Sequence, residues 1–392
     1  MRQAGLVFLL GLCASTYGQS VSAESAILIH AASGKVLFEK NAKVSRFPAS
    51  TTKVMTALLL IERCTPDEVL MAPDSVVTVT GASLHLVPGE TMTARNVLWG
   101  LMLRSANDAC VMVAQHISGS VEKFSELMNQ RAKELGCVNT NFHNPNGLND
   151  ELHTTCAYDL ALITREAMKH EAFRQVVKTQ RHEIERSFNM QDRWLKSKNK
   201  FLSQDHSADG VKTGWTVPAG KCFIGSATRN GEQLISVVLK SEDWVKDTQS
   251  LINWGFNNYQ FERVDAPPLA VASAKVVEGE KSSVKVAPKG KLWNIHRKNQ
   301  MDTNLQPEMP APTLNAPVLS NQRIGTVRVT DRDGFVQELP VFATESVAKY
   351  EPKLMSFSGF SLLGIAAAVG IGTLALRRRS RIRPYAKNWG KY

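Results

Sequence analysis

Three short motifs in this 392-residue chain hold side chains that could together transfer an acyl group. They are Ser50-Thr51-Thr52-Lys53, Ser105-Ala106-Asn107 and Lys212-Thr213-Gly214. A serine hydroxyl near an amine is a nucleophile with its own base, and the other two motifs would add a proton relay and substrate contacts. Each motif alone is common. The Ser-x-x-Lys spacing recurs at Ser120/Lys123, Ser197/Lys200, Ser282/Lys285 and Ser346/Lys349.

The residues after Ser50 predict a buried helix that places this serine beside Lys53. From Thr51 to Ile61 the run is almost wholly apolar, as expected for a helix inside a core. Ser50 would lie in the first turn, where backbone N–H groups favour developing negative charge, with Lys53 at i+3 on the same face. A dry, electropositive setting lowers the pKa of an amine, so Lys53 could serve as a base. The alternative is a helix-capping serine and a lysine that reaches out of the core.

The second motif is predicted to be a turn between two helices. It follows the apolar stretch 97–102 and precedes a helix expected from Ala109 to His116. Such a turn could present Ser105 as a proton shuttle and the Asn107 amide as a hydrogen-bonding group for substrate. Ordinary capping of the second helix by either residue is the alternative.

The third motif opens a predicted β region. Asp209 to Trp215 precedes two β-rich runs, 222–228 and 233–239, which are joined by Asn230-Gly231. This dipeptide is a strong hairpin signal. Lys212 would place a cation at the site and Thr213 a hydroxyl, while Gly214 would let a substrate backbone approach closely. A solvated strand end is the alternative interpretation.

Taken together, the motifs make the chain resemble the low-molecular-mass penicillin-binding proteins that are D-alanyl-D-alanine carboxypeptidases. Further segments carry the resemblance: 26–38 is similar to the opening hairpin of that family, and Phe47-Pro48-Ala49-Ser50 to its approach to the nucleophile. Phe142 to Leu148 and Ala157 to Leu160 are similar to another signature. The resemblance is strong over residues 24–262 and covers the following domain in outline.

The resemblance implies a fold and a set of roles. The fold is an α/β (α+β) penicillin-binding/β-lactamase-like transpeptidase domain, with an antiparallel sheet flanked by helices. Its substrates and inhibitors would be peptidoglycan stem peptides and β-lactams, with terminal D-Ala removed through an acyl-enzyme, and no cofactor. By analogy, the catalytic residues are Ser50, Lys53 and Ser105, and the substrate-binding residues are Asn107, Lys212, Thr213, Gly214 and Trp215.

Two details depart from the family pattern or stay open. Trp215 stands where relatives often have histidine, which would alter the substrate rim but not its backbone N–H. That N–H and the one of Ser50 would form the oxyanion hole. A basic residue upstream of the third motif helps to hold the substrate carboxylate in some members, and both Lys198 and Lys200 are candidates.

Rival functions use the same motifs. A serine β-lactamase of class A carries Ser-Asp-Asn where this chain has Ser105-Ala106-Asn107, and no glutamate is placed convincingly for deacylation. A DD-endopeptidase or transpeptidase would use the same chemistry on a cross-link. A scaffold that binds stem peptides without turnover is the non-enzymatic alternative, and the intact Ser50, Lys53, Ser105 and Lys212 argue against it.

The two ends of the chain predict where it resides. Residues 1–23 resemble a secretory signal peptide, with Val21-Ser22-Ala23 as the cleavage site. Residues 354–376 carry no charge and are long enough to cross a bilayer. Residues 377–392 form a basic tail that should stay cytoplasmic. The expected location is the bacterial cytoplasmic (inner) membrane, with a single pass and the catalytic domain on the periplasmic or extracellular side.

Charge and cysteine content narrow the function further. Of the net charge of +11, seven charges lie in the basic tail and one is Arg2, which leaves 11 − 7 − 1 = +3 for the rest. Nucleic-acid binding is therefore not expected, because no basic stripe remains to carry it. Five cysteines follow the signal, with no Cys-x-x-Cys and no histidine cluster, so neither a metal site nor a disulfide is predicted.

A change of pattern near residue 263 predicts a second domain. Short alternating β runs continue to residue 347, with turns at 288–290 and 331–334. The region 263–347 is therefore expected to be a small all-β domain without catalytic residues. In the family that the chain resembles, this region is a stalk or partner platform.

Overall fold

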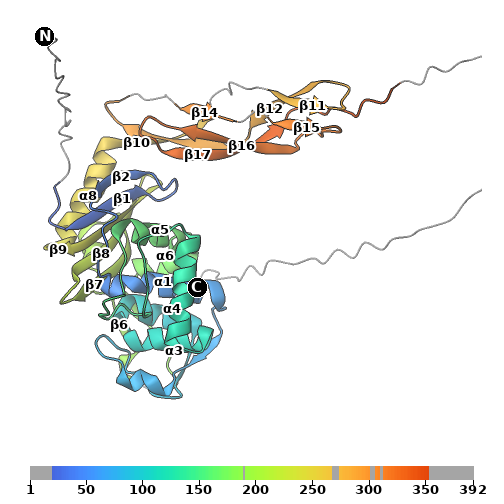
Figure 1. The fold of residues 1–392 in the computed structure, drawn as a ribbon. Coiled ribbons are helices and arrows are strands. Elements are labelled where there is room, and N and C mark those ends of the chain that lie inside the picture. Colours follow the sequence, from blue (N-terminus) through green and yellow to red (C-terminus); the bar gives the residue numbers. More distant parts are fainter. Residues whose placement is uncertain (1–19, 189, 267–272, 301–304, 310–311, 353–392) are drawn as a thin grey trace, which may run out of the picture. The chain divides into compact units, whose positions relative to one another are not determined.

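The computed structural model describes residues 20–188, 190–266, 273–300, 305–309 and 312–352. These residues form two compact units, which divide after Tyr259. Each unit has its own sheet and its own hydrophobic core (Figure 1).

The first unit is built on a five-stranded antiparallel sheet. In spatial order its strands are β2 (Val36–Lys40), β1 (Ser25–His30), β9 (Glu232–Ser241), β8 (Gly220–Arg229) and β7 (Ala208–Thr216). The predicted hairpin joins β8 to β9, where Asn230 and Gly231 have φ values of 52° and 84°. These left-handed values suit a tight turn that matches the twist of the two strands. The order leaves β7, which carries the third motif, at an edge of the sheet.

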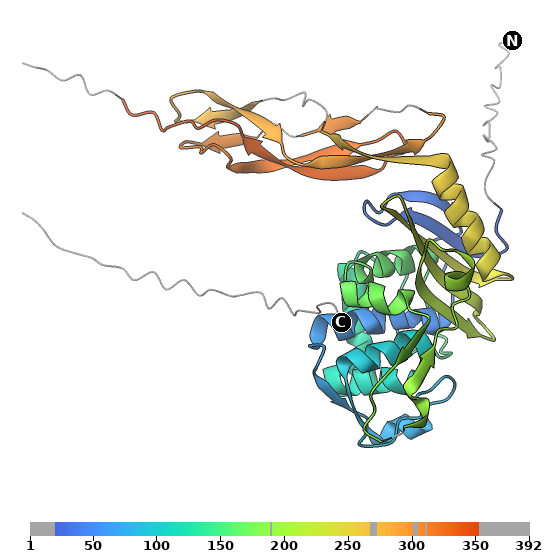
Figure 2. The same ribbon diagram turned by 180° about the vertical axis from the view of Figure 1, so that it is seen from behind.

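Helices cover both faces of this sheet (Figure 2). On β9, Ile235 and Val237 belong to the core shared with the helices of one face. The alternate residue Leu234 packs on the other face, close to Gly255 of α8, because successive strand side chains point to opposite sides. The helices are α1 (Lys53–Arg63), α2 (Ala94–Trp99), α3 (Asn107–Ser118), α4 (Val121–Glu134), α5 (Ala157–Ala167), α6 (Glu171–Lys178), α7 (Phe201–Gln204) and α8 (Trp244–Asn258).

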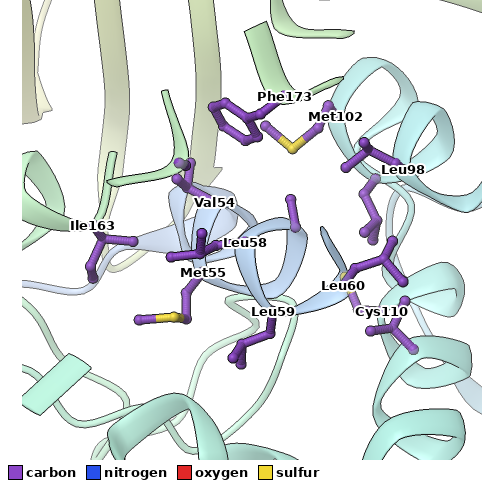
Figure 3. Packing of buried hydrophobic residues seen from close by; sticks show 14 of the residues in the cluster. Val54, Met55, Leu58, Leu59, Leu60, Leu98, Met102, Cys110, Ile163 and Phe173 are labelled. Atoms are coloured by element: carbon purple, nitrogen blue, oxygen red, sulfur yellow. The ribbon is translucent and has the colours of Figure 1, made fainter. Parts of the chain in front are cut away.

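Helix α1 is the centre of the first core. All of its residues from Lys53 to Ile61 are buried, so it is surrounded by protein on every side, as its apolar sequence predicted. Figure 3 shows Leu58, Leu59 and Leu60 leaving this helix in different directions toward neighbouring elements. A helix held in this way gives its N-terminal turn a fixed position, and that turn carries the first motif.

Shorter elements surround the sheet and helices. Two small hairpins pair β3 (Val69–Met71) with β4 (Thr91–Thr93), and β5 (Arg181–Glu183) with β6 (Trp194–Lys196). The 3₁₀ helices are η1 (Ala49–Thr52), η2 (Asp74–Thr78) and η4 (Gln191–Arg193), and η3 (Gly100–Arg104) is a π-helical turn. Because η1 leads directly into α1, the first motif spans the junction of the two.

The second unit consists of β strands. A six-stranded sheet has the order β14 (Gln306–Glu308), β16 (Arg323–Thr330), β17 (Val336–Ala343), β12 (Ser283–Pro288), β11 (Ser273–Val277) and β15 (Thr313–Asn315). A separate pair is formed by β10 (Tyr259–Asp265) and β13 (Lys291–Arg297). The hydrophobic core of the second unit is mainly valine, including Val284, Val327 and Val341. The sequence pattern placed the start of this region at residue 263, whereas β10 begins directly after α8 ends at Asn258.

The predicted end segments fall mostly outside the described residues. This holds for residues 1–19 of the signal peptide, for 354–376 and for the basic tail 377–392. Within the described residues, no helix has the length and apolarity needed to cross a membrane. Residues 20–23 of the predicted signal are described. The backbone N–H groups of Ser22 and Ala23 donate to the buried carboxylate of Asp247, at 2.8 and 2.9 Å.

Candidate active site

The nucleophile candidate Ser50 lies in the short 3₁₀ helix η1, one turn before α1. Ala49 precedes it with a φ of 49°, a left-handed conformation that costs a non-glycine residue about 1 kcal/mol. Ser50 itself is partly exposed, while Ala49, Thr51 and Thr52 are buried. The turn therefore holds three residues inside the protein and presents the serine to a cleft.

Lys53 makes the contacts that a general base needs. Its Nζ lies 3.0 Å from Ser50 Oγ, 2.7 Å from Asn107 Oδ1 and 2.6 Å from the carbonyl oxygen of Asn146. A neutral amine has two N–H groups and one lone pair. Asn107 Oδ1 and the Asn146 carbonyl oxygen can only accept hydrogen bonds. They can therefore accept both N–H groups of a neutral amine and leave its lone pair directed at the Ser50 hydroxyl.

Burial supports a neutral Lys53. The residue has no exposed surface, and this burial lowers the pKa of its amine because the charged form loses hydration. Its counterparts in the other four Ser-x-x-Lys pairs, Lys123, Lys200, Lys285 and Lys349, are all exposed. Ser120, for example, caps α4 by accepting a hydrogen bond from the Lys123 backbone. The fold thus separates the reactive pair from its chance copies.

The second motif is placed by a break between α2 and α3. After the π turn η3, Ser105 takes a left-handed φ of 64°, and Asn107 begins α3. The Asn107 side chain accepts from Lys53 and donates from Nδ2 to the Thr80 carbonyl at 2.7 Å, while its backbone N–H donates to the Ala82 carbonyl at 2.7 Å. Asn107 therefore positions both the base and the 80–82 segment at the cleft.

The third motif runs along the edge strand β7. Lys212 Nζ donates to Ser105 Oγ at 3.0 Å and to the Thr213 carbonyl at 2.8 Å. Lys212 is 2 % exposed, and burial lowers the pKa of its amine well below the usual value. Gly214 passes so close to the nucleophile turn that an added Cβ would lie 3.0 Å from the Ser50 backbone nitrogen. Gly214 therefore packs tightly against the nucleophile turn, and its predicted contact with a substrate backbone stays a prediction.

These motifs line one cleft of about 710 Å³. Six of the predicted site residues line this cleft: Ser50, Ser105, Asn107, Thr213, Gly214 and Trp215. The other two, Lys53 and Lys212, are buried behind them. Lys198 also lines the cleft, and Lys200 is not among its lining residues. The geometry therefore favours Lys198 as the carboxylate-binding residue. The lining residues include Lys198 and Lys221 but no carboxylate, which suits an anionic ligand.

The sequence did not assign roles to the 142–153 segment, although its similarity to a family signature drew attention to it. Asn146 supplies the carbonyl that binds Lys53. Gly147 has a φ of +84°, and a Cβ there would lie 1.8 Å from the Ala49 carbonyl oxygen. His153 contacts Thr52 at 2.9 Å. Residues of this segment thus pack directly against the nucleophile turn and against Lys53.

The cysteines and one group of potential metal ligands are not among the lining residues of this cleft. The five cysteines of the described residues, Cys64, Cys110, Cys137, Cys156 and Cys222, are buried thiols, and burial raises the pKa of Cys110 and Cys222 to about 11. One group of potential metal ligands, Cys64, Glu68 and His116, has its atoms within 4.8 Å of one another. It lies toward the C-terminal ends of α1 and α3, away from the serine.

Comparison with known proteins decides the family. The family model described as D-alanyl-D-alanine carboxypeptidase matches residues 13–243, which is more than half of the chain. The chain belongs to the D-alanyl-D-alanine carboxypeptidase family. It is therefore a serine hydrolase, as the motifs predicted. A second model, the C-terminal domain of penicillin-binding protein 5, matches residues 269–349.

Individual members of the family agree with this assignment. The chain is 32% identical to D-alanyl-D-alanine carboxypeptidase DacF of Bacillus subtilis, over 83% of this chain and 86% of that protein. It is 30% identical to DacC of Escherichia coli, over 84% and 85%. The crystal structure of penicillin-binding protein 5 from Haemophilus influenzae matches with a TM-score of 0.69 at 25% identity, over 84% and 98%. The predicted penicillin-binding fold and the β domain after it are confirmed.

Proposed function

We propose that this carboxypeptidase removes the terminal D-Ala of peptidoglycan stem pentapeptides through an acyl-enzyme on Ser50. The observation that carries this assignment is the Lys53 amine, which is buried, bonded to two acceptors and 3.0 Å from Ser50 Oγ. Peptidoglycan substrates and β-lactam binding both fit the family. Membership favours the carboxypeptidase over a β-lactamase or a scaffold.

In the acylation step, Lys53 takes the Ser50 proton while Oγ attacks the carbonyl carbon of the penultimate D-Ala. The backbone N–H groups of Ser50 and Trp215 stabilise the negative charge on the carbonyl oxygen. The C–N bond then breaks, and the departing amine receives, through Ser105, the proton that Lys53 had taken, so that Lys53 is neutral again. Water attacks the resulting ester while Lys53 accepts its proton. Lys53 then returns this proton to Ser50 Oγ as the ester C–O bond breaks, which releases the shortened peptide and restores the Ser50 hydroxyl.

The terminal carboxylate of the substrate would be held on the cationic side of the cleft. Lys212 is bonded to Ser105 and contributes positive potential there when protonated, and Thr213 adds a hydroxyl. Lys198 lines the same cleft and is a flexible point charge for this carboxylate. Strand β7 lies at the sheet edge, so an extended peptide can align along it.

The function is tested by two linked measurements. The exported portion, incubated with a stem pentapeptide, should release free D-Ala, and a labelled penicillin should attach to Ser50. Ser50→Ala should abolish both. Ser120→Ala is the matched control, because it removes the serine of another Ser-x-x-Lys pair that also starts a helix. Labelling that survives Ser50→Ala would refute the assignment.

We also propose that the protein is a single-pass protein of the bacterial cytoplasmic membrane. The support is the sequence: an uncharged stretch at 354–376, a basic tail at 377–392 and a signal-like N-terminus. Protease added to spheroplasts should remove the catalytic domain and spare an epitope placed after Tyr392. A form ending at Glu351 should be soluble and should hydrolyse a small peptide at close to the full rate. An externally accessible tail would overturn this topology.

A further inference from the structure

His153 lies beneath the nucleophile turn but outside the three motifs. It is 1 % exposed, and its ring stands 5.6 Å from that of Phe142. One ring nitrogen, Nε2, is 2.9 Å from the hydroxyl oxygen of Thr52, which is two residues after Ser50 and fully buried. This buried imidazole therefore makes a polar contact with the turn that presents the nucleophile, in addition to filling space in the core.

The hydrogen bonds define the state of this imidazole. Its Nδ1 faces two backbone N–H groups, those of His143 at 2.9 Å and Asn144 at 3.3 Å, so Nδ1 is an acceptor. Burial lowers the pKa of His153 to about 4, which leaves the ring neutral at neutral pH. The single ring proton is therefore on Nε2, and it is donated to Thr52 Oγ1.

The chain of hydrogen bonds continues to the residue before the nucleophile. Because Thr52 Oγ1 accepts from His153, its own proton is free to be donated to the Ala49 carbonyl at 2.9 Å. Ala49 has the strained φ of 49°, and its carbonyl also touches Gly147. A strained residue keeps its conformation only where its surroundings impose it, and these contacts do so.

We propose that His153 is a positioning residue: through Thr52 it holds the Ala49 carbonyl, and thereby keeps the Ser50 hydroxyl against Lys53. The proposal rests on the proposed role of Ser50. His153 contacts neither substrate nor the reacting atoms, so it acts on the rate of acylation and not on the affinity of the cleft. Small displacements of a nucleophile reduce rates strongly, by up to about 10²-fold for 1 Å.

Four variants test this. His153→Leu removes both ring contacts, and Thr52→Val removes only the hydroxyl that links His153 to Ala49. His153→Gln restores an acceptor and a donor in one side chain. His143→Gln is the matched control, because that histidine belongs to the same loop but its side chain is exposed and bonded to Asp150.

The readout is labelling of Ser50 by a penicillin over a range of concentrations, which separates reversible binding from the maximal acylation rate constant. We expect His153→Leu and Thr52→Val to lower that rate constant by about 10-fold to 10²-fold, with reversible binding unchanged within 3-fold. His153→Gln should recover most of the rate, and His143→Gln should match the wild type. Melting temperatures are measured alongside.

A lowered melting temperature with an unchanged acylation rate constant in His153→Leu would make the residue merely structural and overturn the proposal. If His153→Leu does not fold, Thr52→Val decides alone, and a wild-type rate in it overturns the proposal equally. Failure of the wild-type protein to label at Ser50 is a different result, since it would refute the proposed function itself.

Discussion

Substitution of Gly147 by alanine tests the packing of the site most directly. Two costs are expected. The first is conformational: Gly147 has a φ of +84°, where a residue with a side chain is less stable by about 1 kcal/mol. The second is steric, because the new Cβ would lie 1.8 Å from the Ala49 carbonyl oxygen and 2.4 Å from its carbon.

The steric cost falls on the nucleophile. A contact of 3.0 Å is the least that real Cβ atoms accept, so the Ala49 carbonyl must move by at least 3.0 − 1.8 = 1.2 Å, or Gly147 must move as far. The first movement displaces Ser50, which follows Ala49 directly, and the second displaces the Asn146 carbonyl that binds Lys53. Either movement should slow acylation by about 10²-fold.

Gly136→Ala supplies the control. Gly136 has almost the same φ, +85°, but nothing lies within 4 Å of an added Cβ. Both variants should therefore lose about 1 kcal/mol of stability from the backbone alone, and only Gly147→Ala should lose acylation. Stopped-flow labelling with a fluorescent penicillin and urea unfolding measure the two effects. An acylation rate within 3-fold of the wild type for Gly147→Ala would refute the packing argument.

Three further predictions concern the base, pH and the N-terminus. Lys53→Arg should abolish acylation while circular dichroism shows an intact fold, because arginine keeps its proton; a near-normal rate would mean that another group is the base. Burial lowers the pKa of His153 to about 4 in the folded protein, against 6.5 for an unperturbed histidine. The free energy of unfolding is therefore unaffected by this group above pH 6.5. It falls by about 3 kcal/mol as the pH drops from 6.5 toward 4, because the unfolded chain binds the proton more readily. His153→Gln should remove that part of the acid sensitivity, and equal losses in both proteins between pH 7 and 4.5 would contradict it. A protein that begins at Glu24 should melt at a lower temperature than one that begins at Ser20, because Asp247 loses its bonds to residues 22 and 23; equal melting temperatures would show that those bonds contribute little.

The sequence by itself determined the local part of the site. Ser50 and Lys53 are three residues apart at the start of an apolar helix, and that spacing places them on the same face of the chain. The Asn230-Gly231 hairpin is equally local, since its two residues supply the left-handed angles that the turn needs. Both features depend on neighbours in the chain, so a pattern within about ten residues was sufficient to predict them, and the family signatures extended this to the whole fold.

Only the tertiary structure decided which of several equivalent residues lie at the cleft. Lys198 and Lys200 have the same chemistry, and the path of the chain between β6 and β7 brings only Lys198 into the described lining of the cleft. The two N–H acceptors of Lys53 come from positions 54 and 93 residues further along the chain, and His153 lies 101 residues after Thr52. No local periodicity encodes such contacts, because they exist only after separate segments have packed around α1. Packing also buried Lys53 while leaving its four counterparts in water. That desolvation, which sequence spacing does not report, lowers the pKa of the amine and suits it to the proposed role of base.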